Sequence, residues 1–279
     1  MTATTQNTAA LLVGAEVDEL LIKPTLAESV AAQVARVVRI DSTTFRMPVV
    51  NTDPSASWVA EGAEIPVTDS DIDELLVEPR KLAGLSIITS ELAEDSDPAA
   101  AEEVGRGLAR DLARKMDAAF FGNIAGGIAP TGLGGLSGTT TVDAGDTWAN
   151  LDAFTTASLN AETAGTAITT WVANAATAAA LFGLREATGS NKGLLAADPT
   201  QPARRLIEGA PLLISPAVAN GVVWGVPADR VTLVIRRDAT VRADASVFFT
   251  SDRIAVRATM RVGFGFPDPA SVQQVKVTP

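Results

Sequence analysis

The chain of 279 residues contains no histidine, no cysteine and no tyrosine. Histidine is the commonest general base near neutral pH, and histidine and cysteine are the best ligands for zinc. Without cysteine no disulfide framework can form, so stability must come from packing or from assembly. Serine, aspartate, glutamate and lysine remain for catalysis. The composition therefore argues against an enzyme and a zinc protein, and we expect no cofactor.

Basic residues are also scarce, with 22 Lys and Arg against 33 Asp and Glu and a formal net charge of -11. A strongly acidic chain repels phosphate at long range, whereas a dedicated nucleic-acid reader is normally basic. Such a chain can still enclose nucleic acid without gripping it. Hydrophobic residues make up 47% of the sequence, which is enough for a sizeable core in one large domain or two ordinary ones.

Long hydrophobic runs are absent as well. The N-terminal segment has no basic region, and its apolar run is too short for a signal peptide. The most apolar window, residues 167–184, is mostly alanine and is interrupted by threonine and asparagine, so we reject a transmembrane helix. We expect a soluble protein that is made inside the cell and has no membrane partner.

Residues 51–79 form a long acidic stretch that is short of core-forming residues. Strand-like sequence precedes it at 43–50 and returns at 74–88, which predicts an extended hairpin that projects from the body. Pro48 cannot donate a ladder hydrogen bond and therefore indicates an edge strand. Loops this long are uncommon and are usually functional.

Trp58 lies near the centre of that acidic stretch, although its large apolar ring system favours burial. We interpret it as an anchor for a pocket on another copy of the chain, as tryptophan often is at interfaces. The alternative is that Trp58 folds back on its own hairpin.

The clearest predicted helix covers residues 98–121, with a cap at Ser96 or Asp97 and Pro98 at its first position. Its apolar stripe recurs every four residues at Val104, Leu108, Leu112, Met116 and Phe120. Its other face is expected to carry charge at Arg106, Arg110, Arg114 and Asp117. Leu26, Val30, Val34 and Val38 predict a second helix over residues 25–38.

The rest of the chain reads as mixed helix and strand. Helices are expected at 151–164 and 175–187, and strands at 167–173, 209–215 and 230–235. The glycine-rich residues 122–147 lack the Gly-Lys-Ser/Thr ending of a phosphate loop and predict a flexible connection. Without histidine no catalytic triad can form. The carboxylates of residues 61–73 lack the spacing of a calcium loop, so a solvated acidic tip is favoured over a metal site.

Residues 253–262 form a regular alternating strand. Apolar side chains fall on one face, and Arg253, Arg257 and Arg261 fall on the other, roughly 13 Å apart. This arginine face could be merely solvated, could pair within its own subunit, or could meet the acidic hairpin of a neighbour. The third reading gives a partner to both charged surfaces. The candidate inter-subunit residues are Trp58, Glu61, Glu64, Asp69, Asp71, Arg80, Lys81, Arg253, Arg257 and Arg261.

The order of several blocks resembles that of tailed-bacteriophage major capsid proteins with the HK97-like fold. These blocks are SWVAEGAEIPVTD, EPRKLAGLSIITSELAEDS, KMDAAFFGN followed by APTGL, TTWVANAATAAALFGLREATG, GAPLLISP and FFTSDRIAVRATMRVGFGFPDPA. The resemblance implies an α+β fold in five parts. They are an N-terminal arm at 1–42, an extended loop at 43–84, a peripheral domain with a spine helix at 85–122, an axial domain at 123–247, and return strands of the peripheral domain at 248–279.

The resemblance also implies a function. The chain would self-assemble through pentamers and hexamers into an icosahedral shell around the double-stranded DNA genome, without sequence-specific binding. It would be a component of the virion capsid that assembles in the host bacterial cytoplasm. A scaffold, a portal and a cement protein are the implied partners. Only about 25 residues precede the matching region, so either the scaffold is a separate protein or the short arm does that work.

One departure from the family concerns covalent cross-linking. Some members join a lysine of the extended loop to an asparagine of a neighbour, but here no lysine lies between Pro24 and Arg80 and no asparagine follows Asn220. We therefore expect a shell held together without covalent links. Two alternatives remain: an encapsulin-like storage shell, and a monomeric α/β enzyme, against which the lack of histidine and cysteine counts.

Overall fold

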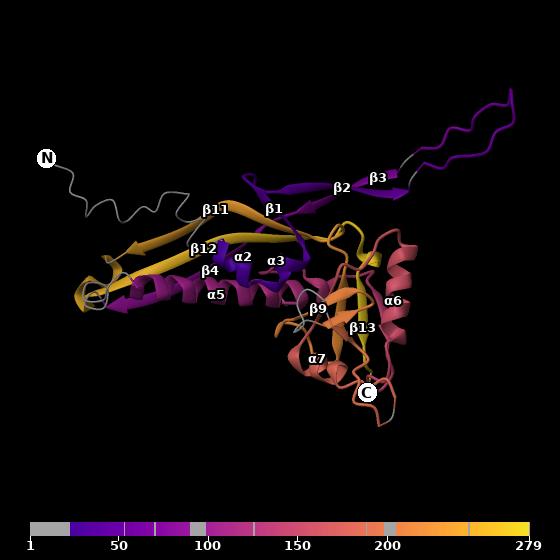
Figure 1. Cartoon of the computed structure of the whole chain (residues 1–279). Helices are drawn as coiled ribbons and strands as arrows, with labels where there is room; N and C mark the ends of the chain where they lie inside the picture. The colour runs from indigo at the N-terminus through magenta and orange to yellow at the C-terminus, as the bar shows by residue number, and fades with distance from the viewer. Residues whose placement is uncertain are drawn as a thin grey trace.

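The computed structural model describes residues 23–278 except 53, 70, 90–98, 125, 188, 198–204 and 245. The expected N-terminal arm lies mostly outside the described residues, as does the helix cap expected at Ser96 to Pro98. The described chain has an elongated layer built on one long helix, a second sheet body at one end of that layer, and a thin projecting hairpin (Figure 1).

The elongated layer is a four-stranded sheet lying along helix α5 (Ala99–Phe121). Its strand order is β1 (Arg36–Ile40), β11 (Thr232–Asp244), β12 (Arg253–Gly265) and β4 (Arg80–Thr89). β1 runs parallel to β11, and the other pairs are antiparallel. β11 continues to Asp244, well beyond the end expected at residue 235, and β12 continues to Gly265, slightly beyond the end expected at residue 262.

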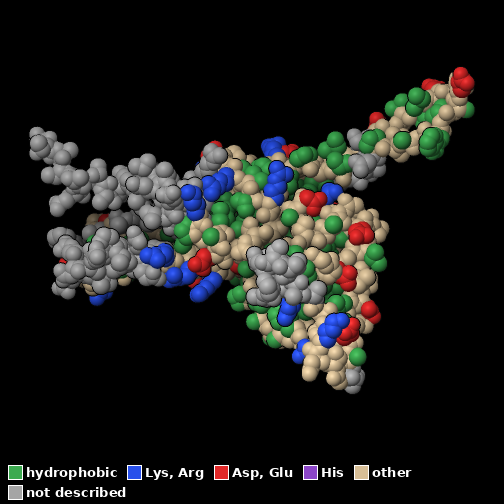
Figure 2. Space-filling model, viewed as in Figure 1, with side chains coloured by type: hydrophobic (Ala, Val, Ile, Leu, Met, Phe, Trp, Pro, Cys, Tyr) green, Lys and Arg blue, Asp and Glu red, His purple; other side chains and the backbone are tan. Residues whose placement is uncertain are grey.

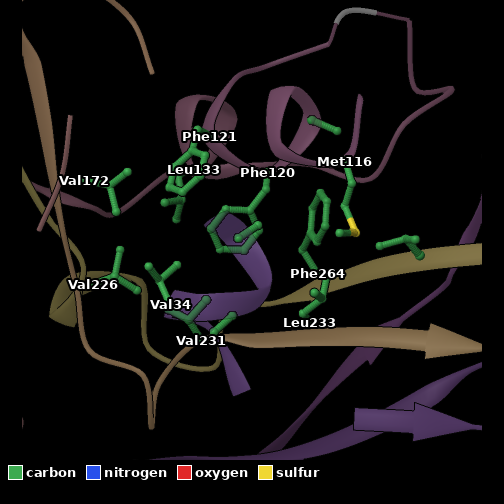
Figure 3. Packing of buried hydrophobic residues seen from close by; sticks show 14 of the residues in the cluster. Val34, Met116, Phe120, Phe121, Leu133, Val172, Val226, Val231, Leu233 and Phe264 are labelled. Atoms are coloured by element: carbon green, nitrogen blue, oxygen red, sulfur yellow. The ribbon is translucent and has the colours of Figure 1, made fainter. Parts of the chain in front are cut away.

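The predicted stripe of α5 forms the core beneath this sheet. Leu112, Met116 and Phe120 are buried, while the side chain of Val104 lies outside the described residues. Phe120 meets Phe264 of β12 edge to face, with ring centroids 5.1 Å apart (Figure 3). The spacing of four residues therefore identified the buried face of α5 correctly.

The second body is a seven-stranded sheet packed against two helices, α6 (Asp152–Thr163) and α7 (Ala175–Phe182). Its core includes Trp171 and Phe154, whose rings meet edge to face at 5.1 Å. The strand order is β5 (Thr140–Asp143), β13 (Gln273–Lys276), β10 (Val222–Val226), β6 (Thr170–Ala173), β9 (Ala210–Ile214), β8 (Arg205–Ile207) and β7 (Ala196–Ala197). Three 3-10 segments are η3 (Leu133–Gly135), η4 (Ser246–Ser251) and η5 (Pro269–Ser271).

The hairpin consists of β2 (Phe45–Thr52) and β3 (Asp71–Val77), which form a separate two-stranded sheet. Among the described residues β2 pairs with β3 alone, and Pro48 therefore lies on an edge strand as expected. The expected single strand over 74–88 is wrong: β3 ends at Val77, and β4 begins at Arg80 and pairs with β12 instead. The break falls at Pro79, which has no N–H for a ladder.

The helix expected over residues 25–38 is also only partly present. The chain forms α2 (Lys23–Glu28) and α3 (Val30–Val34), leaves the helical conformation at Ala35 with ψ of 155°, and continues as strand β1. Val38, placed on the helix stripe by its spacing, instead pairs beside Val234 of β11. β-Branched residues favour strands, and a free edge of the main sheet decides the outcome here.

The glycine-rich connection after α5 is packed against the end of the helix. Leu133 is buried in the main core, and a Cβ at Gly132 would lie 1.9 Å from the Ala119 carbonyl oxygen. Gly132 is therefore required by close backbone approach, a role that the expected flexible connection did not include.

Asp117 corrects another expectation. It was assigned to the charged outer face of α5, but its exposed fraction is only 6%. Its carboxylate accepts hydrogen bonds from the Ser29 hydroxyl at 2.5 Å and from the Val30 and Ala31 amides at 3.0 Å each. Burial raises the pKa of Asp117, and these three hydrogen bonds lower it in part. The carboxylate thus joins the first turn of α3 to α5.

Candidate inter-subunit surfaces

The first candidate surface is the acidic finger, defined as residues 45–77, with its tip at residues 54–69. Every tip residue is exposed, and Trp58 has an exposed fraction of 105%. Ile65 and Val67 are 74% and 91% exposed. In the isolated chain Trp58 therefore does not fold back on its own hairpin, and no part of the tip forms a core.

Two local hydrogen bonds within the tip connect its residues to one another. The Thr68 hydroxyl donates to the Ser55 carbonyl at 3.1 Å across the tip, and the Ala63 amide donates to the Ala60 carbonyl at 3.0 Å in the terminal turn. Gly62 adopts φ of +81° in that turn, which a residue with a side chain rarely does. The tip extends away from the body (Figure 1).

The tip combines apolar and acidic side chains, as its space-filling surface shows (Figure 2). Glu61, Glu64 and Asp69 are all exposed on it, and Asp71 begins β3 at its base. Near the base, Arg46 and Glu74 form an exposed ion pair at 3.3 Å. The structure therefore places the four predicted acidic residues and Trp58 on one projecting element.

The second candidate surface is the arginine face, the side of the main sheet that faces away from α5. Arg253 and Arg257 are exposed on it, and Arg261 is half-buried. Strand pairing sets Arg261 directly beside Lys81 of β4. Arg80, one residue earlier, forms an exposed ion pair with Glu78 at 3.2 Å. The alternation predicted for this strand is confirmed from Arg257 to Val262.

The arginine face also carries exposed apolar residues, which the sequence did not predict there. Leu85 and Ile87 of β4 are 63% and 44% exposed, and Leu85 lies directly beside Arg257. Exposed and partly buried residues alternate along β4, but the sequence alone does not show which face of the strand is covered by α5. The face can therefore contribute both apolar area and positive charge to a contact.

Asp244, at the end of β11, also lies near this face. Hydrogen bonds from the hydroxyl and amide of Ser246 hold the pKa of Asp244 below its usual value, and the Arg257 guanidinium adds a smaller effect in the same direction. Arg257 therefore already has one anionic neighbour in its own chain.

The two candidate surfaces lie apart in one chain, since the finger projects away from the sheet that carries the arginines (Figure 1). Within the described residues no group of three Asp or Glu side chains is placed to hold a metal ion. No helix in the same part of the chain is long and apolar enough to cross a membrane.

A sheet laid along one long helix, a second sheet body at its end and a projecting finger together define an HK97-like α+β capsid fold. A profile described as the phage capsid family matches residues 9–277, and the chain belongs to that family. It is a phage capsid protein by family, and the similar proteins described below include capsid proteins.

Three known proteins illustrate the likeness. The capsid of an empty GTA particle matches with a TM-score of 0.72 and 25% identity over 90% of each chain. A structure from Mycobacterium phage Adephagia matches with a TM-score of 0.72 and 18% identity over 90% of each chain, which shows the fold alone. The capsid polyprotein of Pseudomonas phage PAJU2 is 32% identical over 149 residues, which are 49% of this chain and 22% of that protein. The chain thus matches only about a fifth of that polyprotein.

Proposed function

We propose that many copies of this chain assemble into the icosahedral shell of a tailed phage, through pentamers and hexamers, around packaged double-stranded DNA. The observation that carries the proposal is the acidic finger: a tip without a core, bearing a fully exposed Trp58, in a member of the phage capsid family. Exposed tryptophan at a projecting tip is costly in water and is stabilised by burial against a partner.

In the proposed shell the five sequence segments have separate tasks. Residues 1–42 act as an arm, 43–84 reach across a neighbour, 85–122 and 248–279 form the peripheral part, and 123–247 gather around the symmetry axes. The long helix α5 and sheet strand β12 would give the peripheral part its stiffness. A scaffold, a portal and a cement protein would be separate chains.

The finger would lie across the arginine face of an adjacent copy. The acidic side chains of the finger would approach Arg253, Arg257 and Arg261 on that face, and Arg80 and Lys81 at the edge of β4. Each exposed ion pair contributes only about 0–1 kcal/mol. A finger repeated around every ring makes many such contacts at once, so the shell becomes far tighter than any single pair of subunits.

The net charge of -11 suits the proposed contents. A shell of subunits with a net negative charge repels phosphate at long range, so it would not bind DNA tightly along its wall. DNA could therefore be packed and released without being held at specific sites. The shell itself would be assembled in the host bacterial cytoplasm.

Deleting the tip tests the proposal most simply. The purified full chain is expected to form closed shells in electron micrographs, and a variant with residues 54–69 replaced by a short glycine-serine linker is expected to remain folded but to form none. Normal shells from the deletion variant would contradict the role of the finger. A stable monomer from the unmodified chain at high concentration would contradict the shell and favour an enzyme.

An encapsulin-like storage shell is the second candidate. A virus-like particle from Pyrococcus furiosus shares the fold with a TM-score of 0.63 at 12% identity, and the fold alone does not determine what a shell encloses. The two candidates differ in what the shell encloses. Particles purified from infected or expressing cells would hold nucleic acid in the first case and a protein cargo in the second.

A further inference from the structure

An apolar pocket opens between α5, the start of β4 and the segment that follows α5. Its volume is about 230 Å³. Leu82 and Val262 contribute walls from the sheet, Met116 and Ala119 from the helix, and Ile128 from the segment after it. Met116 and Phe264, which also lines the pocket, project toward each other at this end of the core (Figure 3).

The pocket is unusual in how much apolar surface it leaves uncovered. Ile128 is 79% exposed and Ile124, also in the lining, is 46% exposed. Large apolar side chains that gather at one concave place mark a contact site more often than chance exposure does. At its edge lie three cations, Arg80, Lys81 and Lys115.

We propose that this pocket receives Trp58 from the finger of an adjacent copy. The inference rests on the shell assembly proposed above and names the contact that anchors it. The pocket has the size of one large aromatic side chain, and Trp58 is the fully exposed aromatic residue of the described chain. Tryptophan is enriched among the residues that dominate interface energies, where it fills desolvated pockets of this kind.

Charge complementarity supports the same occupant. Glu61 and Glu64 follow Trp58 by three and six residues, so with the ring in the pocket they lie near its edge. Arg80, Lys81 and Lys115 provide the opposite charge at that edge. Opposite charges around an apolar anchor fix the register of a contact more than its strength.

The pocket belongs to another side of the sheet from the arginine face. Leu82 and Val262 point toward α5, whereas Leu85 and Arg257 on the same two strands point away from it. β4 is the last strand of this sheet, so a finger that crosses its edge reaches the pocket with Trp58 and the arginine face with its other side chains.

The finger of the same chain does not supply the occupant. Its base lies close to the pocket, because Val77 and Ala129 line a neighbouring cavity together. Its tip, however, extends away from the body (Figures 1 and 2). Trp58 on that tip is fully exposed. A second copy is therefore the source of the ring.

Engineered cysteines test the inference, since the chain has none of its own. Ser57→Cys and Val59→Cys, each combined with Ile128→Cys, place a thiol beside Trp58 and one at the pocket. A disulfide forms only when the two Cα atoms come within about 7 Å. The matched controls combine the same finger cysteines with Leu85→Cys, an exposed position on the arginine face. Trp58 and all cations are retained in every variant.

Oxidised particles of the Ile128→Cys pairs are expected to give covalent multimers on denaturing gels for at least one finger position, and the Leu85→Cys pairs are expected to stay mainly monomeric. Multimers from the Leu85→Cys pairs alone, or from neither set in particles of normal appearance, would overturn the pocket and leave the proposed shell intact. If the unmodified chain formed no particles at all, the proposed shell would fail and the pocket with it.

Discussion

Two tryptophans of this chain have opposite environments. Trp171 of β6 is completely buried, meets Phe154 edge to face, and donates its indole N–H to the Ile207 carbonyl at 3.1 Å. Trp58 of the acidic finger is completely exposed. The second sheet body forms its own core, whereas the tip of the finger forms none. The contrast separates residues that fold the subunit from residues that we assign to joining subunits.

The largest effect is expected when the buried ring is removed. Trp171→Ala should lower the free energy of unfolding of the unassembled chain by about 3–5 kcal/mol, because it leaves a cavity and strands a polar partner. Urea unfolding followed by circular dichroism measures this. A loss below about 1 kcal/mol would mean that the second body does not depend on its core as described.

The exposed ring should act on assembly instead. Trp58→Ala should leave the unfolding of the unassembled chain within about 0.5 kcal/mol of the original. It should raise the subunit concentration needed for shells by about 30-fold, the equivalent of about 2 kcal/mol for an anchor residue. Light scattering during a concentration series gives the threshold.

Two controls accompany that variant. Trp58→Phe should recover part of the effect because an aromatic ring still fills the pocket, and Val67→Ala, an exposed apolar residue of the same tip, should do little. If Val67→Ala raised the concentration needed for shells as much as Trp58→Ala does, Trp58 would not be a specific anchor.

The buried carboxylate of Asp117 should contribute at an intermediate level. Asp117→Ala leaves the Val30 and Ala31 amides and the Ser29 hydroxyl without their acceptor, at a cost of about 1–3 kcal/mol. The loss should appear in urea unfolding of the unassembled chain. Asp111→Ala, at an exposed carboxylate on the same helix, is the control and should be nearly neutral.

Asp117 should also leave a signature in pH dependence. Its pKa is raised in the folded chain, so the folded state holds the proton more tightly than the unfolded state. Its stabilising contribution is therefore greatest at low pH and is lost as the pH rises through the folded pKa, by at most about 1.4 kcal/mol per pH unit. Unfolding free energies of the original chain, compared with Asp117→Asn from pH 4 to pH 8, should fall relative to the variant. If the unfolding free energy of the original chain rose relative to that of the variant as the pH increased, the pKa of Asp117 would not be raised by burial.

The smallest effect is expected from the arginine face. Arg257→Ala should raise the assembly threshold by less than about fivefold, because exposed ion pairs contribute about 0–1 kcal/mol. Added salt should reduce the difference further. Arg114→Ala, at an exposed arginine of α5, should be closer to neutral. A loss for Arg257→Ala that exceeded the loss for Trp58→Ala would reverse the ranking of charge and apolar anchor.

Local periodicity predicted the elements that depend on local sequence. The spacing of Leu112, Met116 and Phe120 identified the buried side of α5, and the alternation of β12 identified its arginine face. The spacing of apolar residues alone could not decide whether residues 36–40 form a helix or a strand, because valines four apart are compatible with both. The free edge beside β11 settles that choice, and its partner lies about 200 residues further along the chain.

The contacts that bring distant segments together could not be predicted. Asp117 reads as a surface charge until the amides of Val30 and Ala31 are seen to meet it from 86 or more residues away. The apolar pocket could not be predicted for the same reason. Its lining comes from four separate parts of the sequence, at Leu82, Met116, Ile128 and Val262. The finger was predicted because its composition differs from the rest over one continuous stretch.

The most direct measurement follows the emission of Trp58 itself. Spectra and acrylamide quenching of the original chain minus those of Trp58→Phe isolate this ring from the other three tryptophans. The account predicts red-shifted, easily quenched emission in unassembled subunits, and blue-shifted, protected emission in shells. Emission that is equally quenched in both states, or already protected in the single subunit, would contradict the claim that another copy buries this residue.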